Sequence, residues 1–146
     1  MVQEINLEKE IVDLDKNLYS AKGYFYAGIL SGNFLDENVG TNRTSFDIVA
    51  TTDDDSEISM EKIILNASES VQEYLVDYLS EVKGKKEERV RTFIKNEAPQ
   101  YGHLLKYMPE DVAAIKPYLS DSKLDDELYK IKRRFDTQLK KDNEDI

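Results

Sequence analysis

Apolar and polar positions recur with two different periods along the chain, and the period changes near residue 57. In the first third, apolar residues fall at alternate positions, which is typical of β-strands. From Ser59 onward they recur every three or four residues, which is typical of α-helices. This order predicts an α+β fold, with two or three N-terminal β-strands followed by a mainly helical C-terminal two-thirds. We expect a β-rich part at 1–56 and a helical part at 57–146.

Two segments carry the strand pattern most clearly. "GYFYAGILSG" (23–32) is rich in aromatic and β-branched residues and is bracketed by glycines, and "TSFDIVATT" (44–52) alternates apolar and polar positions. Residues 1–22 fit either a strand or a short helix, and the alternation of Ile5 and Leu7 favours the strand. A sheet of only two or three strands has unpaired edges, which invite pairing with further strands. The pattern therefore also suggests that strands upstream are missing and that the chain is a fragment of a longer protein.

The longest helical pattern begins after Ser59, a residue type that caps helix N-termini well. It continues to Val82, and Gly84 is expected just past its end. Nine apolar positions form its stripe: Met60, Ile63, Ile64, Ala67, Val71, Leu75, Tyr78, Leu79 and Val82. The pattern therefore predicts one helix of more than six turns.

Three further helices are expected. The first covers 85–97 and is stopped by Pro99, because the residue before a proline avoids the helical region. A short helix begins at Pro109, a favoured first position. The last runs from residue 121 or 122 to about 141. Its apolar positions form a narrow stripe for packing on one partner surface: Leu124, Leu128, Ile131, Phe135 and Leu139.

Composition narrows the classes of function. The 146 residues carry a formal charge of −10 and include no cysteine and one histidine. Disulfides, thiolate metal sites and cysteine nucleophiles are excluded, and a cytoplasmic location is expected. A zinc site is disfavoured because such sites use Cys and His. No apolar run is long enough for a membrane span, and the charged N-terminus lacks a signal-peptide pattern.

The charges are unevenly distributed. Residues 53–81 hold nine acids and one lysine, whereas residues 83–95 hold six bases and two acids. The favoured interpretation of the basic stretch is a solvated helix face; a phosphate or nucleic-acid contact stays open. A chain this acidic is repelled by nucleic acid overall, so a nucleic-acid partner is not expected.

No motif for phosphate binding, nucleotide binding or hydrolysis occurs in the chain. The acids of 53–55 lack the alternating ligands and central glycine of a calcium loop and are interpreted as a solvated turn. His103 is the one side chain with an ordinary pKa near neutrality, and a structural role is favoured over a catalytic one. We therefore expect no catalytic residue and no metal ligand, and no enzyme activity of this chain alone.

Two stretches together resemble a known family. "GYFYAGILSGNFLDENVGTNRTSFDI" and "EAPQYGHLL" are similar to the region that follows the nucleotide-binding domain in bacterial ATP-binding proteins related to heat-shock-90 chaperones, gyrase, histidine kinases and mismatch-repair ATPases. The resemblance spans 23–111. The shared positions are Gly23, Tyr24, Leu35, Asp36, Glu37, Val39, Arg43, Phe46, Ala98, Pro99, Gln100 and Tyr101.

The resemblance implies a transducer-like segment that couples the nucleotide state of a chaperone-like ATPase to movement or to partner docking. ATP and Mg²⁺ would belong to an upstream domain, and this chain would hold no cofactor; that it forms part of an ATPase stays open. Arg43 would sense the γ-phosphate; alternatively, it pairs with Asp36 or Glu37 and orders the loop, which we favour. The implied interaction residues are Leu35, Asp36, Glu37, Pro99 and Tyr101.

Three functional hypotheses follow. The first is the non-catalytic coupling segment just described, bound to the upstream ATPase domain. The second is a self-contained small α+β adaptor that binds a protein partner through its amphipathic helices. The third is an enzyme that uses carboxylates around His103. A protein partner is expected, a homodimer stays open, and no membrane partner is expected.

Overall fold

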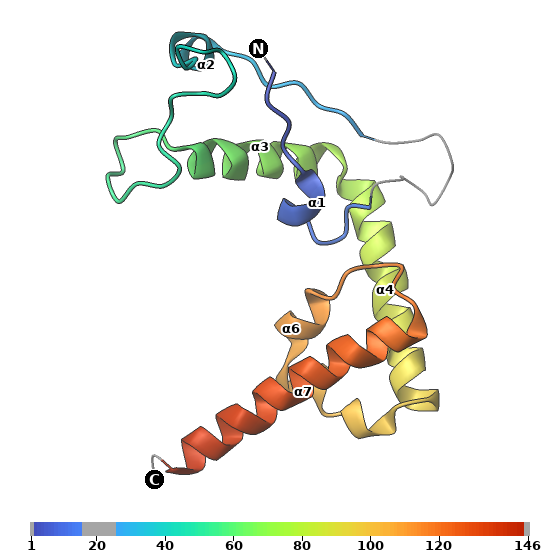
Figure 1. The fold of residues 1–146 in the computed structure, drawn as a ribbon. Helices are drawn as coiled ribbons and strands as arrows, with labels where there is room; N and C mark the ends of the chain where they lie inside the picture. The colour runs from blue at the N-terminus through green and yellow to red at the C-terminus, as the bar shows by residue number, and fades with distance from the viewer. Residues whose placement is uncertain (1, 16–25, 145–146) are drawn as a thin grey trace. The chain divides into compact units, whose positions relative to one another are not determined.

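The computed structural model describes residues 2–15 and 26–144, and this part of the chain is mainly helical (Figure 1). The α-helices are α1 (Leu7–Glu10), α2 (Asn33–Glu37), α3 (Met60–Tyr74), α4 (Val76–Asn96), α5 (Leu104–Tyr107), α6 (Pro109–Ala113) and α7 (Asp121–Glu144), and η2 (Pro99–Tyr101) is a 3₁₀ helix. The chain divides into two compact units, the N-terminal unit (1–79) and the C-terminal unit (80–146). The division falls inside α4.

The prediction of an α+β fold is wrong. Within the described residues no β-strand forms, and pairing of the strand type is limited to an isolated antiparallel bridge between Val39 and Phe46. The predicted strand 23–32 begins outside the described residues, and its described part, 26–32, is neither strand nor helix. An alternating sequence indicates a tendency to extend, but a strand also needs a neighbour to accept its hydrogen bonds. The described residues offer none.

The described start of the chain contains a helix where we expected a strand. The Asn6 side chain accepts the N–H of Glu8 at 3.0 Å and caps α1. This cap and the helix-forming Glu and Lys residues after it outweigh the alternation of Ile5 and Leu7. Residues 16–22 of the same prediction lie outside the described residues.

The connection between the two predicted strands holds α2 and a tight turn. Asn38 joins them: its side chain donates to the Phe34 carbonyl at 2.7 Å, and its own carbonyl accepts the N–H of Asp47 at 2.6 Å. Gly40 donates its N–H to the Ser45 carbonyl at 2.8 Å. A Cβ at Gly40 would lie 3.0 Å from that carbonyl oxygen, so this close approach requires glycine.

The predicted start of the long helix is confirmed. The buried Ser59 side chain accepts the N–H of Lys62 at 3.2 Å and caps α3. The carbonyls of Val49 and Ala50 accept the two preceding N–H groups at 2.8 and 3.0 Å. Three N–H groups of the first turn, which have no partner inside the helix, are thereby satisfied.

The predicted continuation of that helix to Val82 is wrong in one respect. The α-helix is interrupted at Leu75, and α4 then runs through Gly84 instead of ending there. The apolar spacing continues unchanged across Leu75, so the pattern carries no signal of a break. Gly84 lies in open space inside α4 and costs only about 1 kcal/mol relative to alanine, which tertiary packing offsets.

The N-terminal unit has a small core. Among its described residues, the buried apolar side chains are Ile11, Leu14, Val71 and Tyr78. They come from the segment around α1, from α3 and from the first turn of α4, and α1 lies against α3. The described part of this unit therefore buries few large apolar side chains.

The C-terminal unit has a larger core that joins α4, η2, α5, α6 and α7. Its buried side chains are Val90, Ile94, Ala98, Tyr101, Leu104, Val112, Ile115, Leu124, Leu128 and Ile131. The predicted helix end before Pro99 and the predicted start at Pro109 are confirmed. The predicted stripe of α7 is buried up to Ile131, Phe135 is partly buried, and Leu139 is 46% exposed.

Candidate functional site

Among its described residues, the N-terminal unit exposes more large apolar side chains than it buries. Ten are exposed in its described part, against four in the C-terminal unit. The ten are Val2, Ile5, Ile29, Leu30, Phe34, Val49, Ile58, Leu65, Tyr74 and Val76. Single exposed apolar residues are ordinary on protein surfaces, whereas a gathered set marks an interaction site. We call these ten residues the apolar surface of the N-terminal unit.

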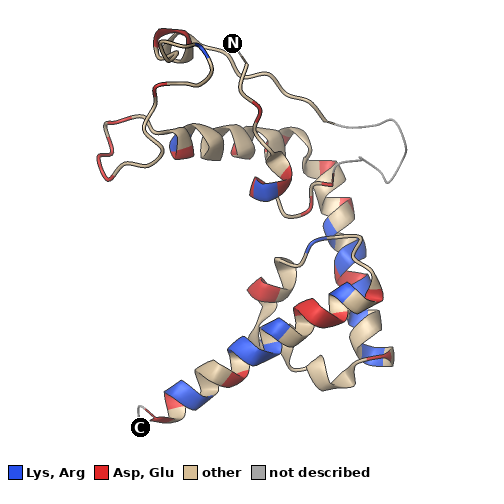
Figure 2. Cartoon of the chain, viewed as in Figure 1, with Lys and Arg blue, Asp and Glu red and all other residues tan. Residues whose placement is uncertain are grey.

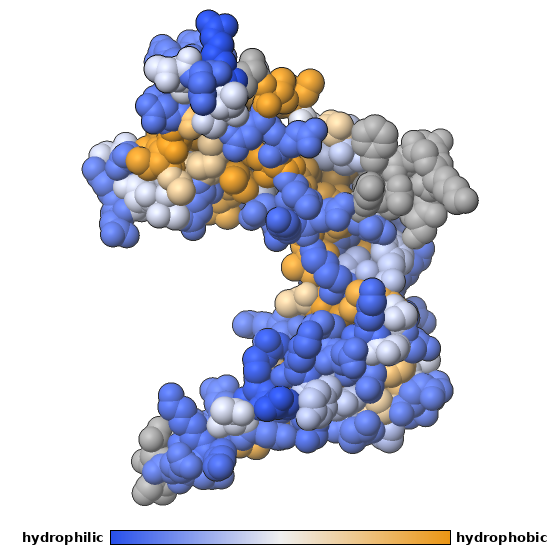
Figure 3. All heavy atoms as spheres, viewed as in Figure 1, coloured by the Kyte–Doolittle hydropathy of each residue, from blue (hydrophilic) through white to orange (hydrophobic). Residues whose placement is uncertain are grey.

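Part of this surface follows α3. Leu65 is 57% exposed and Tyr74 is 78% exposed, and both are on this helix. Ile58 precedes the helix and is 46% exposed. Figure 3 shows apolar side chains gathered along α3 and on the segments beside it. The ring centroid of Tyr74 lies 6.0 Å from that of Tyr26, so an aromatic pair belongs to the same region.

The charge of the two units differs sharply. Residues 1–79 hold sixteen acidic and five basic side chains, a formal charge of −11, while residues 80–146 hold fourteen and fifteen. Figure 2 shows acidic residues on the helices and loops of the N-terminal unit and basic residues recurring along α4 and α7. The apolar surface therefore lies in a strongly acidic unit.

The acidic turn before α3 is ordered by its own hydrogen bonds. Asp54 accepts both the hydroxyl and the N–H of Ser56, and these hydrogen bonds lower the pKa of Asp54. The Lys62 ammonium donates to the carbonyls of Asp54 and Glu57, each at 2.9 Å. The described residues contain no group of three or more His, Cys, Asp or Glu side chains that could hold a metal ion. Residues 53–55 are exposed, as expected for the predicted solvated turn, and the turn is ordered by the hydrogen bonds of Asp54 and Lys62.

The structure brings four of the predicted site residues into one loop. Leu35 is half-buried in α2, and Asp36 and Glu37 are exposed on it. Arg43 is exposed on the following turn, with a left-handed backbone φ of 55°. Among the described ion pairs none joins Arg43 to Asp36 or Glu37, so the favoured loop-ordering pair does not form in this structure. The assignment of Arg43 as a phosphate sensor stays a prediction.

The other two predicted interaction residues lie in the C-terminal unit. Pro99 is exposed at the start of η2, and Tyr101 is buried in the core with 5% exposure. Burial raises the pKa of Tyr101, and the nearby Asp125 carboxylate raises it further. Tyr101 contacts the core of its own unit, so a role at a partner interface stays a prediction.

His103 lies in an aromatic cluster. Its ring centroid is 5.1 Å from that of Phe135, and the Tyr107 ring stacks on the same Phe135 ring with 5.7 Å between centroids. The Lys106 ammonium lies 5.2 Å from the Tyr107 ring centroid. The contact between the His103 and Phe135 rings is a packing contact, and the structural role of His103 stays a prediction.

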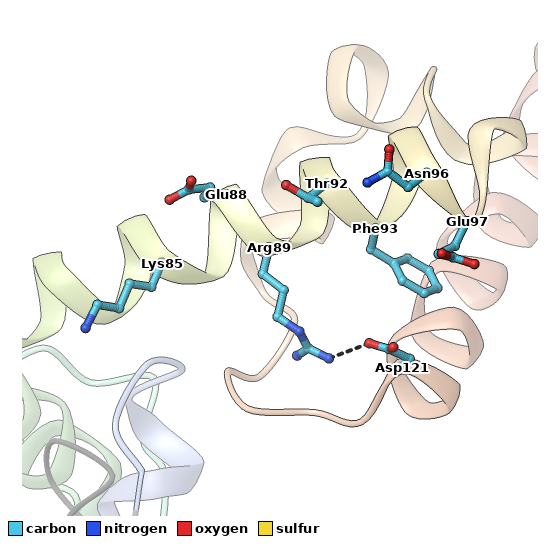
Figure 4. Close-up of a pocket in the computed structure, with 8 residues that line it drawn as sticks. All are labelled: Lys85, Glu88, Arg89, Thr92, Phe93, Asn96, Glu97 and Asp121. Carbon is cyan, nitrogen blue, oxygen red and sulfur yellow. Dashed lines mark hydrogen bonds and ion pairs between the residues drawn. The ribbon is translucent and has the colours of Figure 1, made fainter.

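A hollow of about 430 Å³ lies in the C-terminal unit beside α4 (Figure 4). Arg89 points to Asp121 at the start of α7, with 2.9 Å between guanidinium nitrogen and carboxylate oxygen. Lys85 pairs with Glu81 at 2.9 Å, and this hydrogen bond and charge raise the pKa of Lys85. Both cations are thus matched by carboxylates, and a protonated Lys85 is a poor general base.

Sequence reasoning missed Leu65 and Tyr74 as functional candidates. Neither belongs to the apolar stripe that we derived for this helix, which uses Ile64, Ala67 and Val71 on its inner face. A large apolar residue outside the stripe of an amphipathic helix is the signal that could have identified them.

No helix in the described part of the chain is long and apolar enough to cross a membrane. No family model, curated protein or solved structure matches the chain. The resemblance to the region after the nucleotide-binding domain of bacterial ATP-binding proteins therefore stays a prediction.

Proposed function

We propose that the chain is a non-catalytic protein-interaction protein, located in the cytoplasm, and that its N-terminal unit binds the partner. The supporting observation is that the described residues of this unit, 2–15 and 26–79, include ten exposed and four buried large apolar side chains. Apolar area removed from water contributes about 25 cal/mol per Å². A partner that covers this surface supplies burial that the unit does not achieve by itself. The α+β form of the adaptor hypothesis is excluded, and the helical form replaces it.

The charge of the unit defines the partner's chemistry. A formal charge of −11 on residues 1–79 favours a contact surface with an apolar centre and a basic rim. Complementary charge speeds association and makes it sensitive to salt. A second copy of the chain would bring the same acidic unit and be repelled there. The partner is therefore a different protein.

A narrower form of this function is coupling to an ATP-binding protein, as the resemblance implies. Arg43 favours it, because its guanidinium is exposed on a turn and its left-handed φ of 55° costs a non-glycine residue about 1 kcal/mol. A guanidinium makes strong, bidentate hydrogen bonds to phosphate. ATP and Mg²⁺ would be held by the partner. Leu35, Asp36 and Glu37 would contact the same protein.

The main test compares three serine substitutions in the full chain, tagged and recovered from its source cells. Leu65→Ser and Tyr74→Ser remove exposed apolar groups from α3. Leu139→Ser is the matched control, because Leu139 is a similarly exposed leucine on a helix of the C-terminal unit. The co-purified protein is identified, prepared separately and titrated against each variant at low and high salt.

We expect Leu65→Ser and Tyr74→Ser each to weaken the complex at least tenfold, since truncation of a hot-spot residue at the centre of an interface costs about 2 kcal/mol or more. Leu139→Ser should leave the Kd unchanged, and the Kd should rise with salt. Equal affinities for all three variants would exclude the proposed surface. For the narrower form, Arg43→Gln should abolish any ATP dependence of the Kd without affecting the Leu65 contribution.

A further inference from the structure

One segment of the N-terminal unit, residues 26–32, makes contacts at its two ends, one with α3 and one with α2. At its start, the Tyr26 ring contacts the Tyr74 ring of α3, with 6.0 Å between centroids. At its end, the Gly32 carbonyl accepts the N–H of Asp36 at 3.1 Å in the first turn of α2. Figure 1 shows it as an elongated connection that leads into α2. An extended run of this length spans roughly 20 Å.

The backbone of this segment is unpaired. None of the residues 27–31 takes part in a backbone hydrogen bond among the described residues. Its side chains are also uncovered: Ile29 is 98% exposed and Leu30 is 55% exposed. Water satisfies the N–H and C=O groups here, and the same groups are available to another chain.

Two positions of the segment, 26 and 28, show the two-residue repeat of a strand. A Cβ at Gly28 would lie 3.0 Å from the Tyr26 hydroxyl, so positions 26 and 28 face the same side. This two-residue repeat is the strand repeat, and it leaves Ile29 on the opposite side. Within "YAGILS", Tyr26 and Ile29 are residue types that are enriched in strands.

We propose that the 26–32 segment binds by adding itself as a strand to the exposed sheet edge of a protein partner. This inference rests on the proposed function and specifies how part of the contact is made. The sheet belongs to the partner; the chain's own fold remains helical. Main-chain hydrogen bonds supply affinity, and pockets for Ile29 on one face and Leu30 on the other supply specificity.

The charge around the segment indicates which kind of sheet edge it would bind. Sheet edges in natural proteins are commonly guarded by lysine, which discourages pairing with other chains. The N-terminal unit, with a formal charge of −11, and the exposed Asp36 and Glu37 next to the segment would neutralise such lysines. Pairing between two copies would instead bring two acidic units together. The occupant is therefore a lysine-bearing edge of a different protein.

A proline scan tests the mode of binding. Proline replaces residues 27 to 31 of the full chain one at a time, and the protein co-purified with the wild-type chain is the titrated probe. Because a strand presents its N–H groups to alternate sides, pairing along one edge uses every second N–H. Proline should therefore lower the affinity at least tenfold at one set of alternate positions, which is either 27, 29 and 31 or 28 and 30. Proline at the other set should leave the affinity near the wild-type value. None of these positions is helical, so the helical content should not change.

Amide exchange of residues 27–31 in the complex should show the same alternation. Equal tolerance of proline at all five positions, or equal loss at all five, would overturn strand addition. If Leu65→Ser still weakens that complex, the proposed function stands without this mode; if no Leu65-dependent complex forms, both fail. A purified chain that dimerises with the same proline alternation would overturn the choice of a basic partner.

Discussion

The Lys86 ammonium donates a hydrogen bond to the Ala113 carbonyl at 2.7 Å, and the Lys86 residue is only 7% exposed. Ala113 ends α6, so this bond satisfies one of the C-terminal carbonyls of that helix from a neighbouring element. The positive charge also lies at the negative end of the helix dipole. The contact therefore ties α4 to α6 within the C-terminal unit.

Replacing Lys86 by methionine keeps the aliphatic stem and removes the donor. We expect the free energy of unfolding of the C-terminal unit to fall by about 1–3 kcal/mol, because the Ala113 carbonyl loses its partner. Urea unfolding followed by circular dichroism measures this. Lys85→Met is the control: its exposed pair with Glu81 contributes little, so stability should stay near wild type. An equal loss of stability in Lys86→Met and Lys85→Met would contradict the stabilising role of the hydrogen bond between Lys86 and Ala113.

We expect the buried Tyr101 to make the free energy of unfolding fall at alkaline pH. Its pKa is raised in the folded chain, chiefly by burial, so the unfolded chain loses the phenolic proton at lower pH. Its contribution is complete below the ordinary tyrosine pKa of about 10 and is lost as pH rises above that value. Thermal unfolding between pH 8 and 11 measures it. Tyr101→Phe should show a shallower decline than wild type; an identical slope would count against this cause.

Tyr118 has a left-handed backbone φ of 64°, a conformation that disfavours residues with a Cβ. Tyr118→Gly should raise the free energy of unfolding by up to about 1 kcal/mol, because relief of strain exceeds the added flexibility of the unfolded chain. Tyr118→Val should lower it, since β-branched residues tolerate this conformation worst. Urea midpoints measure both variants. The reverse order of stabilities would show that the side chain's contacts outweigh its backbone strain.

The two units should differ in local stability. The described residues of the N-terminal unit include four buried apolar side chains, whereas the core of the C-terminal unit has ten. Amide exchange in the free full chain should therefore be faster in α3 than in the 124–131 part of α7. Binding of the co-purified protein should slow exchange in α3 and leave α7 unchanged. Equal protection of both helices in the free chain would contradict the expected difference in local stability.

Local signals in the sequence predicted local structure well. The Ser59 cap, the stop before Pro99, the start at Pro109 and the last helix follow from residues within one turn of each boundary. The predicted strands failed because strand formation depends on a partner distant in sequence, and alternation at 44–52 says nothing about whether one exists.

The exposure of individual side chains was harder to predict from the sequence than the boundaries of the C-terminal helices. Lys86 was grouped with a solvated basic face, although the buried Val82 and Val90 lie one turn to either side of it, which places it toward the core. The resemblance directed attention to Arg43 and its loop, while exposure in the structure pointed to Leu65 and Tyr74. Exposure depends on what the rest of the chain covers, which a helical pattern alone does not determine.

The central claim is that the exposed apolar surface of the N-terminal unit binds a protein partner. The most direct measurement places a photoreactive benzophenone amino acid at position 65 or at position 139 of the full chain in its source cells. Leu65 and Leu139 are both exposed leucines on helices, and each unit contains one of them. We predict a crosslinked product of a single mass at position 65 and none at position 139. No product at position 65, or the same products at both positions, would contradict the account.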